Sequence, residues 1–130
     1  MLEWACENTD IIISIMALFF SIGIYIHGIN RERKNDTLKC FSEIRRKYYN
    51  TKNFDDKEKL KYLNELEFFA TGINTGIYSI KIVKKLSGSR LIKQYNYTMA
   101  DFIHSRREKY GDEKTYCEYE KMIKKLRSMK

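Results

Sequence analysis

The chain has 130 residues, which is enough for one small soluble domain beside an N-terminal apolar segment and too few for a second such domain. It contains no proline and only 6 glycines, which favours helices over a turn-rich β-sandwich, so we expect an all-α protein. All 25 Lys and Arg residues follow residue 30, and a net charge of +8 with this distribution attracts phosphate groups of lipid or nucleic acid.

Residues 11–29 form an apolar segment, IIISIMALFFSIGIYIHGI, that carries no formal charge when His27 is neutral. At about 1.5 Å per residue, such a helix is roughly 28 Å long, close to the hydrocarbon thickness of a bilayer. A cleaved signal peptide has basic residues before its apolar core, whereas Glu3, Glu7 and Asp10 precede this segment. We therefore predict a retained transmembrane helix.

Basic residues on one side of this segment predict its orientation. Arg31, Arg33 and Lys34 follow the segment directly, and loops rich in Lys and Arg stay cytoplasmic. We therefore predict a single-pass protein of the cell membrane with its N-terminus outside. The expected parts are an extracytoplasmic tail, the transmembrane helix, a basic juxtamembrane segment and a helical cytoplasmic domain, at residues 1–10, 11–29, 30–36 and 37–130.

Small residues recur on one face of the apolar segment at helical spacings, namely Ser14, Ala17, Ser21 and Gly28. Small side chains let two membrane helices approach closely, so this face is a candidate packing surface for a homo-oligomer. Any apolar segment of this length also contains some small residues by chance, and that alternative stays open.

Apolar residues at helical spacing predict further helices at residues 37–49, 56–73, 78–86, 90–110 and 113–128. The first either continues the apolar segment as one helix or bends within residues 28–35. Asp55 and Glu58 form a capping box at the start of the second of these helices. Residues 87–89 end the third helix, and Gly111 ends the fourth. Together these helices predict a small bundle of four to five helices.

The sequence resembles a family of small, uncharacterised bacterial and phage proteins with a membrane anchor and a helical domain of unknown function. The resemblance covers roughly residues 38–126, and its central stretch reads LNELEFFATGINTGIYSIKIVKKLSGSRLIKQYNYTMADFIHSRREKYGDEKTYCEYEKMIKKL. The matching features are Phe68, Phe69, Gly76, the 91–103 helix with Arg106, and the segment of Tyr116, Glu118 and Tyr119. The resemblance implies a helical fold and brings no activity with it.

No constellation of residues predicts catalysis, a metal site or a cofactor, so we expect a non-catalytic protein. The two histidines are isolated, and the three cysteines, Cys6, Cys40 and Cys117, have no zinc-site or disulfide spacing. We interpret the neighbouring carboxylates Glu65 and Glu67 as solvated positions.

Basic residues supply the candidate contacts to anionic lipid or phosphate, which are Arg31, Arg33, Lys34, Arg45, Arg46 and Lys47. Tyr48 and Tyr49 follow the second cluster, and basic residues interleaved with aromatic rings also suit nucleic acid. Membrane-tethered cytoplasmic domains carry excess Lys and Arg for topological reasons alone, so we expect membrane lipid as a partner and nucleic acid less.

Three functions are compatible with these features. The one we favour is a membrane-anchored helical interaction module that binds a protein partner or a second copy of itself at the inner membrane face. A small pore former or toxin that oligomerises through its transmembrane helix would instead impair growth through residues 1–35 alone. A membrane-tethered nucleic-acid-binding protein would lose binding steeply with salt.

Overall fold

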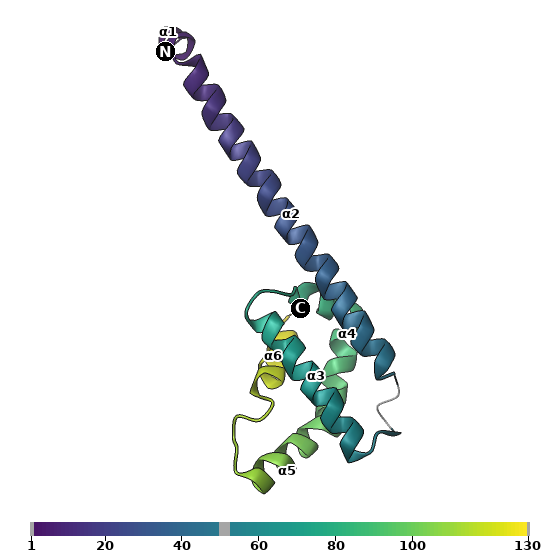
Figure 1. Ribbon diagram of the computed structural model, residues 1–130. Helices are drawn as coiled ribbons and strands as arrows, with labels where there is room; N and C mark the ends of the chain where they lie inside the picture. Colours follow the sequence, from purple (N-terminus) through teal and green to yellow (C-terminus); the bar gives the residue numbers. More distant parts are fainter. Residues whose placement is uncertain (1, 50–52, 130) are drawn as a thin grey trace. The chain divides into compact units, whose positions relative to one another are not determined.

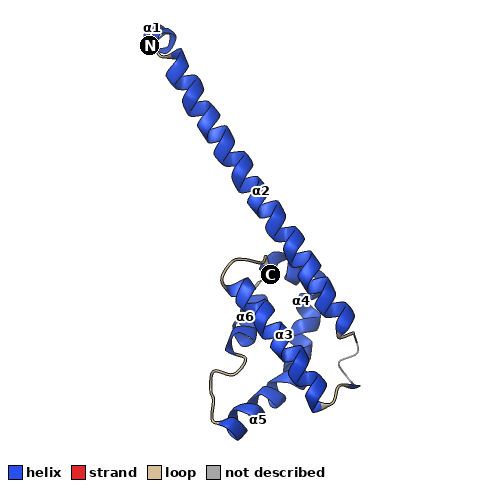
Figure 2. Cartoon of the chain, in the orientation of Figure 1, coloured by secondary structure: helices blue, strands red, loops and turns tan. Residues whose placement is uncertain are grey.

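The computed structural model describes residues 2–49 and 53–129, and within these ranges the chain is helical with no β-strand (Figure 2). The predicted all-α fold class is confirmed, including one long apolar N-terminal helix followed by a small helical bundle. The chain divides into two compact units, Met1–Glu32 and Arg33–Lys130. We call the second unit the helical domain.

The first unit holds α1 (Leu2–Glu7) and the N-terminal part of α2 (Thr9–Lys47) (Figure 1). The sequence left open whether the apolar segment and the following helix form one helix or bend within residues 28–35. The structure shows one uninterrupted helix, α2. Within the described ranges, α2 alone is long and apolar enough to cross a membrane, and no residue of its apolar window is buried. The hydroxyl groups of Ser14 and Ser21 donate to the backbone oxygens of Asp10 and Ala17 at 2.8 and 2.9 Å, so both are satisfied within the helix.

Helix α3 (Asp56–Asn74) begins as predicted, because the Asp55 side chain accepts the backbone N–H of Glu58 at 2.8 Å. Its inward face is apolar and supplies much of the core, with Tyr62, Leu63, Leu66, Phe69, Ala70 and Ile73 buried. The Phe69 ring stacks with the rings of Phe41 of α2 and of Tyr78, at centroid distances of 5.5 and 5.1 Å. These contacts bring together segments that lie far apart in the sequence.

Helix α4 (Ile80–Gln94) consists of two helical segments that meet at Ser87, where φ is −158° and ψ is 24°. The predicted break within residues 87–89 is therefore confirmed at Ser87, although it spans one residue and not three. The chain kinks there and continues as a helix. Val83 before the kink and Leu91 after it are both buried in the same core, so packing keeps the two segments together. The Ser-Gly-Ser sequence thus interrupts the helix at Ser87, as its low helix propensity predicts.

A π-helical turn, η2 (Tyr95–Met99), joins α4 to α5 (Ala100–Tyr110). Its wider turn inserts a residue into the helical register, and Met99 and Ile103 both face the core. Helix α5 ends at Gly111 as predicted, with φ 66° in the left-handed region that favours glycine.

Helix α6 (Cys117–Ser128) begins four residues after the predicted start at residue 113, because Tyr116 adopts a left-handed conformation with φ 59°. The Glu67 carboxylate of α3 accepts the backbone N–H groups of Glu118 and Tyr119, each at 2.9 Å. Our interpretation of Glu67 as a solvated position is therefore wrong: its side chain caps α6 from a neighbouring helix.

The C-terminal part of α2 belongs to the core of the helical domain through Thr37, Phe41 and Ile44. The buried Thr37 hydroxyl donates to the Arg33 backbone oxygen at 2.7 Å and accepts the Ser79 N–H at 2.8 Å. Because Ser79 is the residue before α4, this side chain ties α2 to the start of α4.

Candidate functional site

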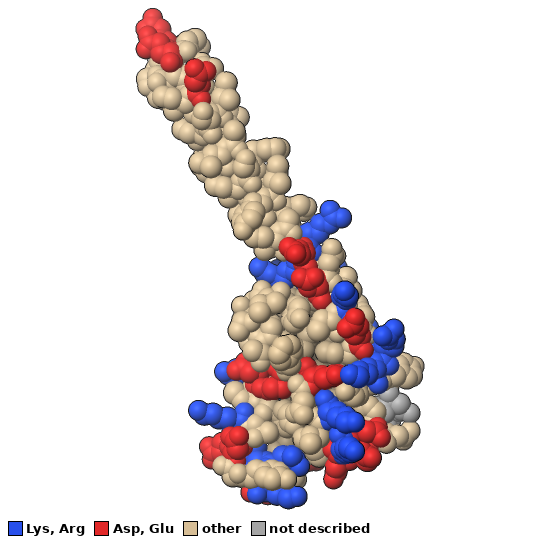
Figure 3. Space-filling view, viewed as in Figure 1, with Lys and Arg blue, Asp and Glu red and all other residues tan. Residues whose placement is uncertain are grey.

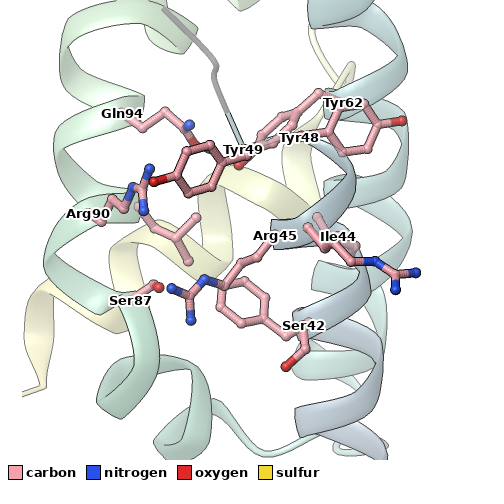
Figure 4. Close-up of a pocket in the computed structure, with 12 residues that line it drawn as sticks. Ser42, Ile44, Arg45, Tyr48, Tyr49, Tyr62, Ser87, Arg90 and Gln94 are labelled. Atoms are coloured by element: carbon pink, nitrogen blue, oxygen red, sulfur yellow. Dashed lines mark hydrogen bonds between the residues drawn. The ribbon is translucent and has the colours of Figure 1, made fainter.

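A pocket of about 290 Å³ lies in the helical domain between the C-terminal part of α2 and α4, with one residue from α3 (Figure 4). Lining residues within 41–49, from the end of α2 and the two residues after it, form one wall, and lining residues within 87–94 of α4 form the opposite one. The lining residues combine aromatic and aliphatic side chains with arginines and neutral polar groups: Phe41, Ser42, Ile44, Arg45, Arg46, Tyr48, Tyr49, Tyr62, Ser87, Arg90, Leu91 and Gln94.

Aromatic rings support the pocket. The Tyr48 ring meets that of Tyr62 edge-on at 5.0 Å between centroids, and Phe54 packs against both rings at 5.8 and 6.0 Å. The Tyr62 hydroxyl donates to the Gln94 Oε1 at 2.7 Å. Burial raises the pKa of Tyr62 to about 12, against the opposing influence of Gln94 and Arg90. The hydroxyl is therefore protonated at neutral pH and holds the Gln94 amide in place.

Arginine side chains give the pocket its charge. Arg45 extends from α2 toward Ser87, and the Arg90 guanidinium lies over the Tyr49 ring with its central carbon 5.9 Å from the ring centroid (Figure 4). In the part of the chain that the structure describes, no carboxylate lies within 4.0 Å of the Arg45, Arg46 or Arg90 guanidinium. The pocket is therefore positively charged without an internal counter-ion.

The α4 wall follows from helical spacing, because Ser87, Arg90, Leu91 and Gln94 recur at intervals of three and four residues on one face. Sequence reasoning missed Arg90 and this face. The spacing was a usable signal, but nothing in the sequence placed this face opposite Arg45.

The predicted anion contacts separate into two groups. Arg45 and Arg46 line the pocket, whereas Lys47 pairs with Glu65 of α3 at 2.7 Å, and this hydrogen bond raises the pKa of Lys47. The remaining three, Arg31, Arg33 and Lys34, are not among the lining residues. Figure 3 shows both signs of charge over the helical domain, while most of the apolar part of α2 is uncharged.

Residues Ser14, Ala17, Ser21 and Gly28 of the predicted packing face are exposed on α2. A Cβ added at Gly28 would meet no atom within 4 Å. The use of this face for helix packing stays a prediction.

Among the described residues that line the pocket there is no histidine, cysteine or carboxylate, so these residues offer binding groups and no paired nucleophile and base. Outside the pocket, His104 contacts Glu108 at 3.1 Å on an exposed face of α5. Arg107 binds the Glu120 carboxylate and the Thr115 backbone oxygen and so fastens the segment before α6. No group of three or more His, Cys, Asp or Glu residues within the described ranges could hold a metal ion.

A family model described as a domain of unknown function (DUF4760) matches residues 11–126, which include the apolar part of α2 and nearly all of the helical domain. The chain belongs to this family. The DUF4760 match confirms the resemblance to a family of unknown function, whereas the bacterial or phage source and the membrane anchor stay predictions. No curated protein and no solved structure matches the chain. All the residues that line the pocket lie within the DUF4760 match.

Proposed function

We propose that this protein is a non-catalytic helical binding module, anchored by residues 11–29 to the cell membrane with the helical domain at the cytoplasmic face. The observation that carries the proposal is the exposure of the whole apolar window of α2. Its large side chains, among them Leu18, Phe19 and Phe20, are 60–72% exposed. Exposed apolar surface of this extent marks an interaction with lipid or another apolar surface.

The same helix length and composition also occur in signal sequences and in core helices of soluble proteins. A core helix buries its apolar side chains, and within the described ranges nothing covers those of the α2 window. Acidic residues before the segment and Arg31, Arg33 and Lys34 after it favour an anchor over a signal sequence and favour a cytoplasmic helical domain.

An anchor suits a binding module because confinement to a membrane raises the effective concentration of a weak binder near its partner. The proposed partner is a protein or a second copy of the chain. Membrane lipid contacts the apolar helix in either case.

Extraction of membranes with alkaline carbonate tests the anchor. We expect the full-length protein to stay in the membrane pellet and to retain an N-terminal tag. The variant with Phe19→Arg and Phe20→Arg should move to the soluble fraction, because each arginine near the centre of a membrane helix costs about 2.5–3.5 kcal/mol on insertion scales.

The matched control carries Phe68→Arg and Tyr97→Arg, which place the same charges at exposed aromatic positions of the helical domain. It should stay in the pellet like the parent protein. Release of the parent protein by carbonate would contradict the anchor, and loss of the N-terminal tag during expression would identify a cleaved signal sequence instead.

A further inference from the structure

The α2–α4 pocket has a charge imbalance that its own residues do not resolve. Arg45, Arg46 and Arg90 line one hollow, and no ion pair to any of them occurs within the described ranges. Figure 4 shows Arg45 reaching from α2 toward α4, on which Arg90 lies. Because like charges that share a hollow repel one another, a bound anion would stabilise this arrangement.

The donors at the pocket fit phosphate better than carboxylate. Each guanidinium has five N–H donors, and the hydroxyl groups of Ser42 and Ser87 add two more. A carboxylate has two acceptor oxygens and a single charge, whereas a phosphate monoester has three strong acceptor oxygens and a charge near −2 at pH 7. Three cations with hydroxyl donors beside them therefore exceed what one carboxylate satisfies.

The apolar residues of the lining indicate what the ligand carries besides its phosphate. The rings of Phe41 and Tyr49, together with Leu91, give the pocket flat and apolar walls next to the arginines. Its volume of about 290 Å³ lies near the lower limit of small-molecule sites, roughly 300 Å³, and suits one small molecule and not a peptide. A ring or short apolar chain joined to the phosphate would fill this space.

We propose that the pocket binds a small phosphate monoester, with the phosphate held by Arg45 and Arg90 and its apolar part against Tyr49 and Phe41. The phosphate comes either from a soluble metabolite or from the headgroup of phosphatidic acid, since the binding chemistry is the same. The site lies wholly within the helical domain, so it does not depend on the proposed membrane anchor.

Phosphorus NMR on the full-length protein in non-ionic detergent tests the site, with phenyl phosphate, inorganic phosphate and dihexanoyl phosphatidic acid as probes. We expect saturable binding of an ester at least about tenfold tighter than that of inorganic phosphate, a difference of about 1.4 kcal/mol. Tighter binding of phenyl phosphate points to a soluble ligand, and tighter binding of phosphatidic acid points to a lipid headgroup. Benzoate, a carboxylate with the same ring, should compete at least about tenfold less well than phenyl phosphate.

Charge-matched variants distinguish binding in the pocket from general electrostatic attraction of an anion to the basic protein. The double substitution Arg45→Gln and Arg90→Gln should weaken ester binding at least about tenfold, whereas Lys39→Gln with Lys93→Gln should change it less than about twofold. Lys39 and Lys93 are exposed on the same two helices and are not among the lining residues of the pocket. Their substitution by glutamine removes the same charge as the arginine pair. Arg45→Lys with Arg90→Lys keeps the charge and should give an intermediate loss, because lysine lacks the planar fork.

Three outcomes overturn the proposal. One is no saturable binding of either ester by the parent protein, and another is an equal loss in the arginine and lysine pairs. The third is equal binding of inorganic phosphate and both esters, which would exclude a role for the aromatic walls. Circular dichroism of each variant checks its fold, and if the glutamine pair does not fold, the Arg→Lys pair decides. None of these readouts needs a membrane, so they can fail while carbonate extraction supports the anchor.

Discussion

Two buried tyrosines in the core differ in how their hydroxyl groups are satisfied. Tyr62 donates to Gln94, whereas the Tyr119 hydroxyl is buried without a hydrogen-bond partner in the described part of the chain. An unsatisfied buried hydroxyl costs roughly 1–3 kcal/mol, and a typical hydrogen bond contributes about 1 kcal/mol. We therefore predict that Tyr119→Phe raises the free energy of unfolding and that Tyr62→Phe lowers it by about 1 kcal/mol. Urea unfolding of the full chain in detergent measures both, and a loss of stability in Tyr119→Phe would contradict the assignment.

Alkaline pH should destabilise the helical domain through Tyr62. Burial raises its pKa to about 12 in the folded chain, while an unfolded tyrosine ionises near pH 10. Between these values the folded state holds the proton that the unfolded state has lost, so the contribution is complete below pH 10 and is lost as pH rises toward 12. The expected slope from this residue is about −1.4 kcal/mol per pH unit.

The variant Tyr62→Phe removes the contribution of this residue and leaves those of Tyr95 and Tyr119, whose pKa values burial also raises. It should therefore show a shallower decline in unfolding free energy from pH 10 to 12 than the parent protein. Tyr97→Phe changes an exposed ring and serves as the control. Identical pH profiles for the parent protein and Tyr62→Phe would show that Tyr62 does not carry the effect.

At the scale of the elements, substitution by alanine should have opposite effects on stability at two helical glycines. A Cβ at Gly72 of α3 would lie 2.4 and 2.6 Å from ring carbons of Tyr78, whose ring stacks on Phe69. A Cβ at Gly88 of α4 would instead meet the flexible Lys84 side chain at 2.8 Å. Gly72→Ala should therefore destabilise the domain by about 1–3 kcal/mol through overpacking.

Gly88→Ala is the matched control and should be neutral or stabilising by up to about 1 kcal/mol, since alanine favours helix. Thermal unfolding in detergent compares the two variants. A smaller loss for Gly72→Ala than for Gly88→Ala would contradict the close packing of α3 against Tyr78.

The helices that the sequence predicted well have local signals. The Asp55 cap and the apolar stripe of α3 placed that helix almost to the residue, and Gly111 marked the end of α5. Tertiary contacts decide the features that the prediction missed. The start of α6 depends on Glu67 reaching from α3. Burial of Val83 and Leu91 in one core holds the two segments of α4 together across Ser87, and a local pattern shows neither contact.

Only the α2 side of the candidate site could be predicted from the sequence. Arg45 and Arg46 stand out as a basic cluster beside tyrosines, so composition alone singled them out. Arg90 is one basic residue among many in α4, and its helix face gains meaning only when packing places it across from α2. Contacts between segments more than 40 residues apart in the sequence have no signature in a single sequence.

For the whole molecule, the central claim is that residues 11–29 cross the membrane and leave the helical domain in the cytoplasm. Native Cys6 is exposed, but Cys40 and Cys117 are half-buried, so weak labelling of these two would report burial as well as topology. Two single-cysteine variants avoid this problem, and both carry Cys40→Ser and Cys117→Ala. One version keeps Cys6, and the other replaces it with serine and carries Lys85→Cys at an exposed position of α4.

Labelling of intact cells with a membrane-impermeant thiol reagent, before and after permeabilisation, is the most direct measurement. The account predicts that Cys6 reacts in intact cells and that the cysteine at position 85 reacts only after permeabilisation. The reverse pattern would invert the orientation. Reaction of neither site before permeabilisation, with the protein found in the soluble fraction, would contradict the membrane anchor itself.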